Sequence, residues 1–169
     1  MKSWIRTVVT ALGVLMLFGP ANADVVLRAA LLEVAHERPL PLSRLDLPVG
    51  DEGFAGGGQA LADNNTTGQF LGQSYELVEV RTDRDGIDQA MAGLKADGVG
   101  VVIVMALAED LLTIADHPAG EGMLILNAEA RDDRLRGADC RDNVLHIAPS
   151  RAMVADGLAQ YMVWKKWTE

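Results

Sequence analysis

Apolar runs and segments of helical period alternate along this chain. Residues 25–34 are apolar except at Arg28 and Glu33, which is typical of a parallel strand buried on both faces. Residues 101–104, Val-Val-Ile-Val, form a second such run. The pattern predicts strands over residues 25–34, 74–81, 100–105, 123–126 and 144–147.

Between the strands, apolar residues recur at the spacing of a helix. Ile87, Ala90, Met91 and Leu94 stand at i, i+3, i+4 and i+7, and Gly98 is expected to end this helix. A short helix is expected over residues 108–115. A last helix follows Pro149-Ser150 and runs out at residues 164–167. Its apolar stripe consists of Val154, Leu158, Tyr161 and Met162.

The first predicted helix, residues 53–64, contains Gly56-Gly57-Gly58. Each glycine costs a helix about 1 kcal/mol against alanine. Three in a row indicate that another group packs close to the helix backbone. Residues 64–68, Asn-Asn-Thr-Thr-Gly, are expected to stop this helix.

Strands separated by helices predict an α/β fold: a Rossmann-like, three-layer lobe with a parallel sheet of about five strands and helices on both faces. Ligands of such sheets bind beyond the carboxyl ends of the strands. The loops after Val34, Met105 and Leu126 are therefore expected at the functional edge. The connection 36–51, with its three prolines, is unusually long for a loop between a strand and a helix.

The first 23 residues have the pattern of a secretory signal peptide. Lys2 and Arg6 precede an apolar segment, residues 8–18, and Ala21-Asn22-Ala23 is a small-x-small cleavage site. An uncleaved membrane anchor is the alternative. Cleavage after Ala23 would leave residues 24–169 as one exported domain with no further membrane-spanning stretch.

The charge of this domain excludes two classes of partner. The whole chain has a net charge of −9, and two of its 15 basic residues precede residue 24 while all 24 acidic residues follow it, so residues 24–169 carry −11. Nucleic acids and anionic membrane surfaces both require clustered Lys and Arg. Neither is therefore expected as a partner.

The sequence contains no complete motif for cofactor binding, metal binding or nucleophilic catalysis. Gly56-Gly57-Gly58 fails the dinucleotide pattern because Leu61 holds its third glycine position, and residues 83–94 fail as a calcium loop because Leu94 replaces the bidentate Glu. His36, His117 and His146 lack metal-ligand spacing. No serine-nucleophile elbow is present. We therefore expect no catalytic residue, no metal and no cofactor, and predict that the protein is not an enzyme.

Cys140 is the single cysteine, so an intrachain disulfide cannot form. A nucleophile and an intermolecular bridge are open alternatives. An incidental thiol is the simplest interpretation.

Several short motifs, in order, resemble type I periplasmic solute-binding proteins of the leucine and branched-chain amino-acid ABC transporters. These motifs are Pro41-Leu42-Ser43, residues 59–65 (Gln-Ala-Leu-Ala-Asp-Asn-Asn), Gly68, Leu71-Gly72, residues 75–78 (Tyr-Glu-Leu-Val) and residues 143–150 (Asn-Val-Leu-His-Ile-Ala-Pro-Ser). The run 64–68 and the ending 161–167 are similar to the subgroup associated with pyrroloquinoline-quinone (PQQ)-dependent alcohol dehydrogenase systems.

The resemblance implies an N-terminal lobe that binds a small-molecule solute in the periplasm. It also implies a transporter permease or a quinoprotein dehydrogenase system as partner. The implied ligand-binding residues are Ser43, Ala106, Leu107, Ala108, Asn127, Ala128 and Glu129. Amino-acid binders usually carry Ser or Thr in the loops after the third and fourth strands, where this chain has residues 106–108 and 127–129. Their absence here, together with the charge of Glu129, indicates that amino-acid specificity is not retained.

Proteins of this family have a second lobe, which these 169 residues do not include. We expect residues 24–169 alone to bind solutes weakly and to associate through exposed apolar residues that include Trp164 and Trp167. A small exported α/β enzyme or redox accessory, and a fragment without a ligand, are the alternative functions.

Overall fold

The computed structural model describes residues 25–38, 43 and 49–167. The strands are β1 (Val25–Val34), β2 (Gln73–Thr82), β3 (Val101–Met105), β4 (Leu124–Asn127) and β5 (Val144–His146). The α-helices are α2 (Phe54–Gly68), α3 (Ile87–Ala96), α4 (Ala108–Ala115) and α5 (Arg151–Trp164). Short 3-10 turns are η1 (Arg84–Gly86), η2 (Pro118–Gly120) and η3 (Asp133–Arg136). The predicted signal segment, with Ala21 and Ala23, lies outside the described residues.

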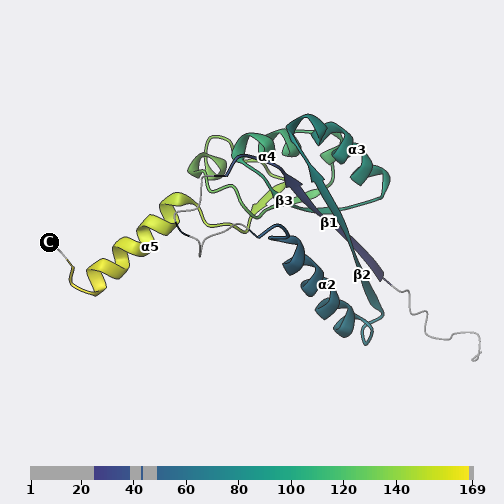
Figure 1. Cartoon of the computed structure of the whole chain (residues 1–169), viewed down its shortest axis with the longest axis horizontal. Coiled ribbons are helices and arrows are strands. Elements are labelled where there is room, and N and C mark those ends of the chain that lie inside the picture. Colours follow the sequence, from purple (N-terminus) through teal and green to yellow (C-terminus); the bar gives the residue numbers. More distant parts are fainter. Residues whose placement is uncertain (1–24, 39–42, 44–48, 168–169) are drawn as a thin grey trace, which may run out of the picture.

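The five strands form one parallel sheet in the order β2-β1-β3-β4-β5. This confirms the predicted α/β fold class, and each strand lies within two residues of its predicted bounds. Helices α3 and α4 lie on one side of the sheet and α2 on the other (Figure 1). None of the helices within the described residues is long and apolar enough to cross a membrane.

The main core lies between the sheet and the helices α3 and α4. Alternate strand residues such as Leu32, Val104 and Ile125 point into it and are fully buried. Met91 of α3 and Ile114 of α4 are buried against them, which confirms the helical face predicted from the spacing of Ile87 and its neighbours. Gly98, at a positive φ of 69°, ends α3 as expected.

The predicted end of helix α2 is wrong. It does not stop at Asn64 but continues through the expected stop signal to Gly68. The side chains of Asn64 and Thr66 donate to backbone carbonyls four residues earlier, so these polar residues are satisfied within the helix. Asn65 bonds instead to Tyr75 at the start of β2.

The sheet side that carries α2 is only partly covered. Gly57 approaches Leu31 of β1 and Leu77 of β2, so α2 lies over these two strands. On the same side, Leu124 of β4 and Leu145 of β5 remain 36% and 55% exposed.

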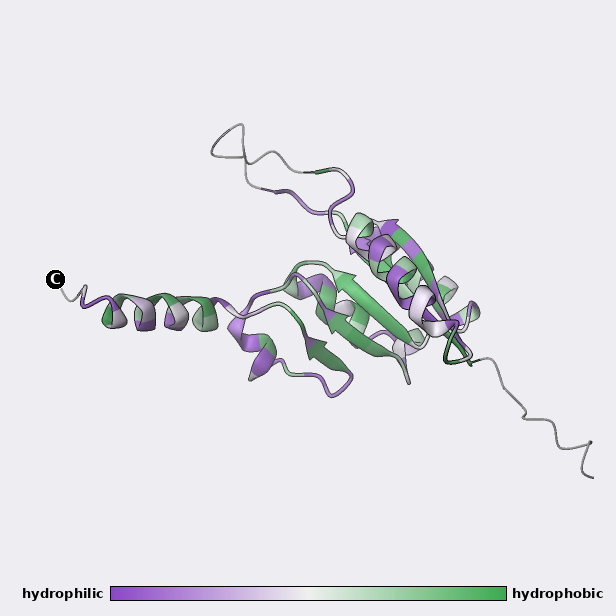
Figure 2. Ribbon diagram, turned by 90° about the horizontal axis from the view of Figure 1, so that it is seen from below, coloured by the Kyte–Doolittle hydropathy of each residue, from purple (hydrophilic) through white to green (hydrophobic). Residues whose placement is uncertain are grey.

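Helix α5 extends away from the body of the protein, and hydrophobic residues recur along its successive turns (Figure 2). None of its residues is buried. The stripe of Val154, Leu158, Tyr161 and Met162 therefore does not face a core in this structure.

Candidate functional site

The carboxyl edge of the sheet carries a group of interacting charged side chains and one histidine, which we call the edge cluster. It consists of Glu33, His36, Arg38, Glu52, Arg81 and Glu129. These residues come from the ends of β1 and β2, the segments after β1 and β4, and the turn before α2. A parallel sheet brings them together because all its strands end at the same edge.

One half of the edge cluster is built on β1 and β2. Glu33 and Arg81 stand opposite each other in the strand register, and Arg81 Nε lies 3.5 Å from a Glu33 carboxylate oxygen. The Arg81 guanidinium lies 4.1 Å from the centre of the Phe54 ring, a cation–π contact that fixes its position. Arg38 joins this half through Glu33, whose carboxylate lies 3.9 Å away. Arg38 also binds Glu52 at 2.5 Å, and this hydrogen bond raises the Arg38 pKa.

The other half is the pair of His36 and Glu129. His36 Nε2 lies 3.3 Å from Glu129 Oε1, and His36 Nδ1 lies 3.3 Å from the carbonyl oxygen of Val34. Glu129 Oε2 is shielded from solvent and has no hydrogen-bond partner among the described residues. A carboxylate oxygen left without a donor is costly, so this atom is the site's least satisfied group.

Asn127 shapes the loop that presents Glu129. Its side-chain Nδ2 donates to the Ala130 carbonyl at 2.7 Å and contacts His146 Nδ1 at 2.9 Å, while Oδ1 accepts from the backbone N–H groups of Glu129 and Ala130. The amide is fully buried and fully bonded. The structure therefore places Asn127 beneath the edge as a positioning residue, with Ala128 exposed above it.

The loop after β3 contributes mainly backbone. Ala106 and Ala108 are buried, whereas Leu107 is 46% exposed at the N-cap of α4. The first turn of α4 contains Glu109 and Asp110, which already complement the positive end of the helix dipole. A ligand carboxylate is therefore disfavoured at this helix end.

Ser43, the remaining predicted ligand residue, is exposed, and its neighbours in sequence lie outside the described residues. The sequence reasoning identified Glu129 but missed Glu33, His36, Arg38 and Arg81. Glu33 could have been identified from the sequence, because it is a charged residue within an apolar strand and lies next to the carboxyl end of that strand. Within the described part of the chain, no group of three or more His, Cys, Asp or Glu residues is placed to hold a metal ion.

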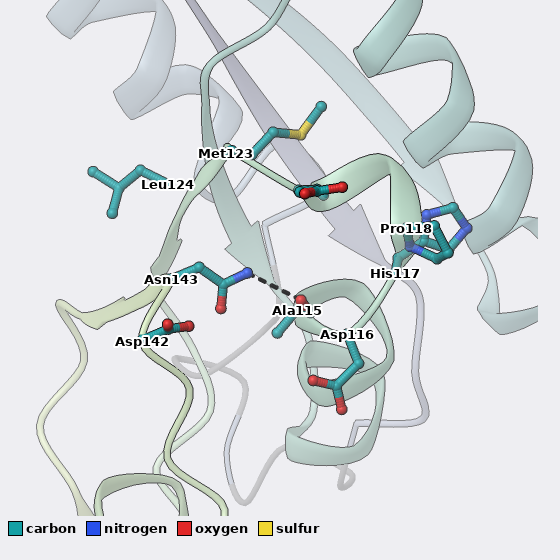
Figure 3. Close-up of a pocket in the computed structure, with 11 residues that line it drawn as sticks. Ala115, Asp116, His117, Pro118, Met123, Leu124, Asp142 and Asn143 are labelled. Atoms are coloured by element: carbon teal, nitrogen blue, oxygen red, sulfur yellow. Dashed lines mark hydrogen bonds between the residues drawn. The ribbon is translucent and has the colours of Figure 1, made fainter.

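A hollow of about 580 Å³ lies at the opposite edge, between the segments that lead into β4 and β5 (Figure 3). Three of its polar side chains are bonded within the protein. Asn143 donates to the Ala115 carbonyl at 3.0 Å, Asp116 binds Arg141, and His117 accepts from the Ala119 N–H. The exposed carboxylates of Glu121 and Asp142 are the polar side chains that this hollow leaves to a ligand.

The fold is similar to a solved structure, the closed conformation of the leucine-, isoleucine-, valine-, threonine- and alanine-binding protein from Brucella ovis. The TM-score is 0.51 and the sequence identity 22%. The match covers 73% of this chain and 32% of that chain. No family model and no curated protein sequence matches this chain. At this level of identity the likeness establishes the fold, a parallel α/β lobe arranged like part of that binding protein.

Proposed function

We propose that this protein is an exported solute-binding component and that the carboxyl edge of its sheet contacts the solute. The fold similarity to an amino-acid-binding protein supports a binding role. The edge cluster supports the location, because ligands of open parallel sheets bind beyond the strand ends.

The observation that carries the proposal is the Glu129 carboxylate. One of its oxygens faces His36, and the other has no hydrogen-bond partner within the described residues. Its side chain is 30% exposed, so part of it borders the solvent at the edge. A solute that donates an O–H or N–H to this group would relieve the cost of the unpaired oxygen.

The surrounding charges define the class of solute. At the edge, Glu33 and Glu52 are paired with Arg81 and Arg38. Glu109 and Asp110 at the start of α4 are paired with Arg134 and Arg84. Glu129 faces only His36 among the described residues, so it is the carboxylate left to a solute. A free carboxylate on the solute would be repelled by Glu129 and would find no vacant helix end. Small alcohols, polyols and amines therefore suit this edge better than amino acids.

The wider setting that we propose is the periplasm, reached through the signal sequence and cleavage after Ala23. There the protein would serve an ABC-type uptake system or a quinoprotein alcohol oxidation system. A preference for hydroxylated solutes agrees with the second of these settings.

Chemical-shift mapping of the purified protein tests the proposal. Ethanol, glycerol and ethanolamine are the probes, and leucine is the amino-acid comparison. We expect shifts at His36, Glu129 and residues 106–108 with at least one probe and weaker shifts with leucine. Shifts confined to residues 116–123 and 142–143 would place binding at the opposite edge and contradict the proposal.

A pair of matched variants sharpens this test. Glu129→Gln should weaken binding of the cationic probe on the order of tenfold, because a charge-assisted hydrogen bond is lost. Glu121→Gln makes the same change at the opposite edge, where Glu121 lines the hollow shown in Figure 3. It should leave binding of the cationic probe unchanged. Equal effects of the two variants would argue against Glu129 as a contact.

A further inference from the structure

Helix α5 is rich in apolar residues, and none of them is buried by another part of the chain within the described residues. All residues from Arg151 to Trp167 are exposed, and Leu158 and Trp164 are 61% and 71% accessible. At 3.6 residues per turn, Met153, Val154, Leu158, Tyr161 and Met162 occupy one broad half of the helix. Soluble proteins bury such a face.

The start of α5 directs it away from its own sheet. The Ser150 hydroxyl caps the helix by accepting from the Met153 N–H at 3.3 Å. Asp133 accepts from the Ala152 N–H at 3.1 Å, and Arg151 lies 3.2 Å from Asp132. These bonds attach the first turn to the 131–133 segment, from which the helix projects outward (Figure 1).

The same chain has an uncovered apolar surface, which we call the open face. It is the side of β3, β4 and β5 that α2 does not reach. The strand register aligns Leu31, Ile103, Leu126 and Leu145 in one row across this side. The row runs from the buried Leu31 beneath α2 to the exposed Leu145. An apolar groove of about 300 Å³ beside α2 leads onto the open face.

The dimensions of the open face match one helix. Adjacent strands lie about 4.8 Å apart, so β3 to β5 extend over about 10 Å. A helix with its side chains is about 10–12 Å wide. Parallel sheets are covered by helices on both faces, and one more helix beside α2 would complete this sheet.

We propose that α5 of one copy of this chain packs on the open face of a second copy, and that the exchange is reciprocal. The chain contains both the unpartnered helix and the surface that lacks one, so two copies satisfy each other in a closed two-fold dimer. Lys165 and Lys166 at the end of α5 are positively charged, which favours association with a second copy whose net charge is −9.

The exposed aromatic residues of α5 supply part of the area that a stable dimer needs. Tyr161, Trp164 and Trp167 are 46%, 71% and 60% exposed. A whole aromatic side chain buries roughly 150–250 Å², so at these exposures the three together would remove roughly 270–440 Å² from solvent. The rest of the roughly 800 Å² per partner of a stable interface would come from the other apolar residues of α5 and from the open face.

Analytical ultracentrifugation over a range of concentrations tests the proposal. Wild-type protein should form dimers. Leu158→Asp on α5 and Leu145→Glu on the open face should each raise the dimer Kd on the order of 100-fold, because each buries a charge. Ala159→Asp, on the opposite side of α5 from Tyr161 and Trp164, is the matched control and should leave the dimer intact. A wild-type monomer, or a dimer retained by Leu145→Glu, would overturn the proposal.

Mixing the two disruptive variants distinguishes reciprocal exchange from pairing of two α5 helices. A mixture of Leu158→Asp and Leu145→Glu proteins retains one intact helix and one intact open face, so a heterodimer should form. Trp164 and Trp167 report the same event, because their fluorescence shifts to the blue when α5 is buried. A mixture that stays monomeric while both variants have native circular dichroism would contradict the exchange.

Discussion

The side chain of Asn65 in α2 bonds to both backbone polar groups of Tyr75 in β2. Its Nδ2 donates to the Tyr75 carbonyl oxygen at 3.0 Å, and its Oδ1 accepts from the Tyr75 N–H at 2.8 Å. Strand β2 lies at the edge of the sheet, so its backbone groups on one side lack a neighbouring strand. Asn65 takes the place of that strand at one position and ties the end of α2 to the sheet.

Asn65→Ala should therefore lower the free energy of unfolding by about 1–3 kcal/mol, because it removes two hydrogen bonds from a part-buried site. Asn64→Ala is the matched control, since Asn64 donates only to Ala60 in its own helix. Urea unfolding of the two variants measures the difference. Equal destabilisation would show that the bonds to Tyr75 contribute little.

The contact between Asn65 and Tyr75 illustrates which parts of the fold can be predicted from the sequence and which cannot. Strands such as β1 and β3 were predicted closely, since continuous apolar runs bounded by polar residues carry the signal locally. The end of α2 was predicted wrongly, because Asn-Asn-Thr-Thr-Gly is a local stop signal. The bond from Asn65 to Tyr75 and the packing of Gly68 against Gln73 override it, and neither is visible in one sequence.

The candidate site could likewise be predicted only in part from the sequence. Glu129 was predicted because it follows a buried strand at the functional edge. Its contact with His36 joins residues 93 positions apart, so only the strand order could reveal it. The loop position of Asn127 suggested a ligand contact, whereas burial and four hydrogen-bond contacts assign its amide to the 128–130 turn.

The three consecutive glycines of α2, Gly56, Gly57 and Gly58, should respond differently to alanine. A Cβ on Gly56 or Gly58 would meet nothing within 4 Å, so each substitution should stabilise the protein by about 0.5–1 kcal/mol. A Cβ on Gly57 would lie 3.1 Å from Leu77 and 3.2 Å from Leu31. Gly57→Ala should therefore lose that gain. Thermal unfolding of the three variants provides the comparison, and a uniform gain would refute close packing at Gly57.

Arg141 holds Asp116 through two hydrogen bonds, of 2.6 and 2.8 Å. The hydrogen bond from Arg141 lowers the Asp116 pKa below its ordinary value of 3.8. A carboxylate with a depressed pKa stabilises the folded state above its unfolded pKa, and this contribution is lost as the pH falls through the folded value. The window therefore lies below about pH 4.

Arg141→Gln should return the Asp116 pKa toward 3.8 and flatten the acid limb of the stability curve. A carbon-detected NMR titration of the Asp116 carboxyl measures the first effect, and urea unfolding between about pH 2 and 5 measures the second. An Asp116 pKa that stays depressed in Arg141→Gln would mean that another group is responsible.

His146 should make stability depend on pH in a higher range. Burial lowers its pKa below 6.5, and the charge of Arg136 acts in the same direction. Its Nδ1 lies 2.9 Å from Asn127 Nδ2, and its Nε2 lies 3.2 Å from the Leu135 carbonyl oxygen. Because the Asn127 amide nitrogen can only donate, His146 Nδ1 must accept, and the neutral ring with its proton on Nε2 satisfies both contacts.

The sign of the pH effect follows from proton binding. Between the folded and unfolded pKa values of His146, the unfolded chain holds more protons, so the free energy of unfolding rises with pH. The rise should level off above about pH 6.5. Once the pH falls below the folded-state pKa of His146, a proton on Nδ1 would oppose the Asn127 amide and weaken the turn that presents Glu129. His146→Gln should remove this part of the curve, and subtraction of its urea-unfolding profile from that of the wild type isolates the contribution. An NMR titration of the His146 ring provides the independent check: a pKa at or above 6.5 would contradict the neutral, buried ring.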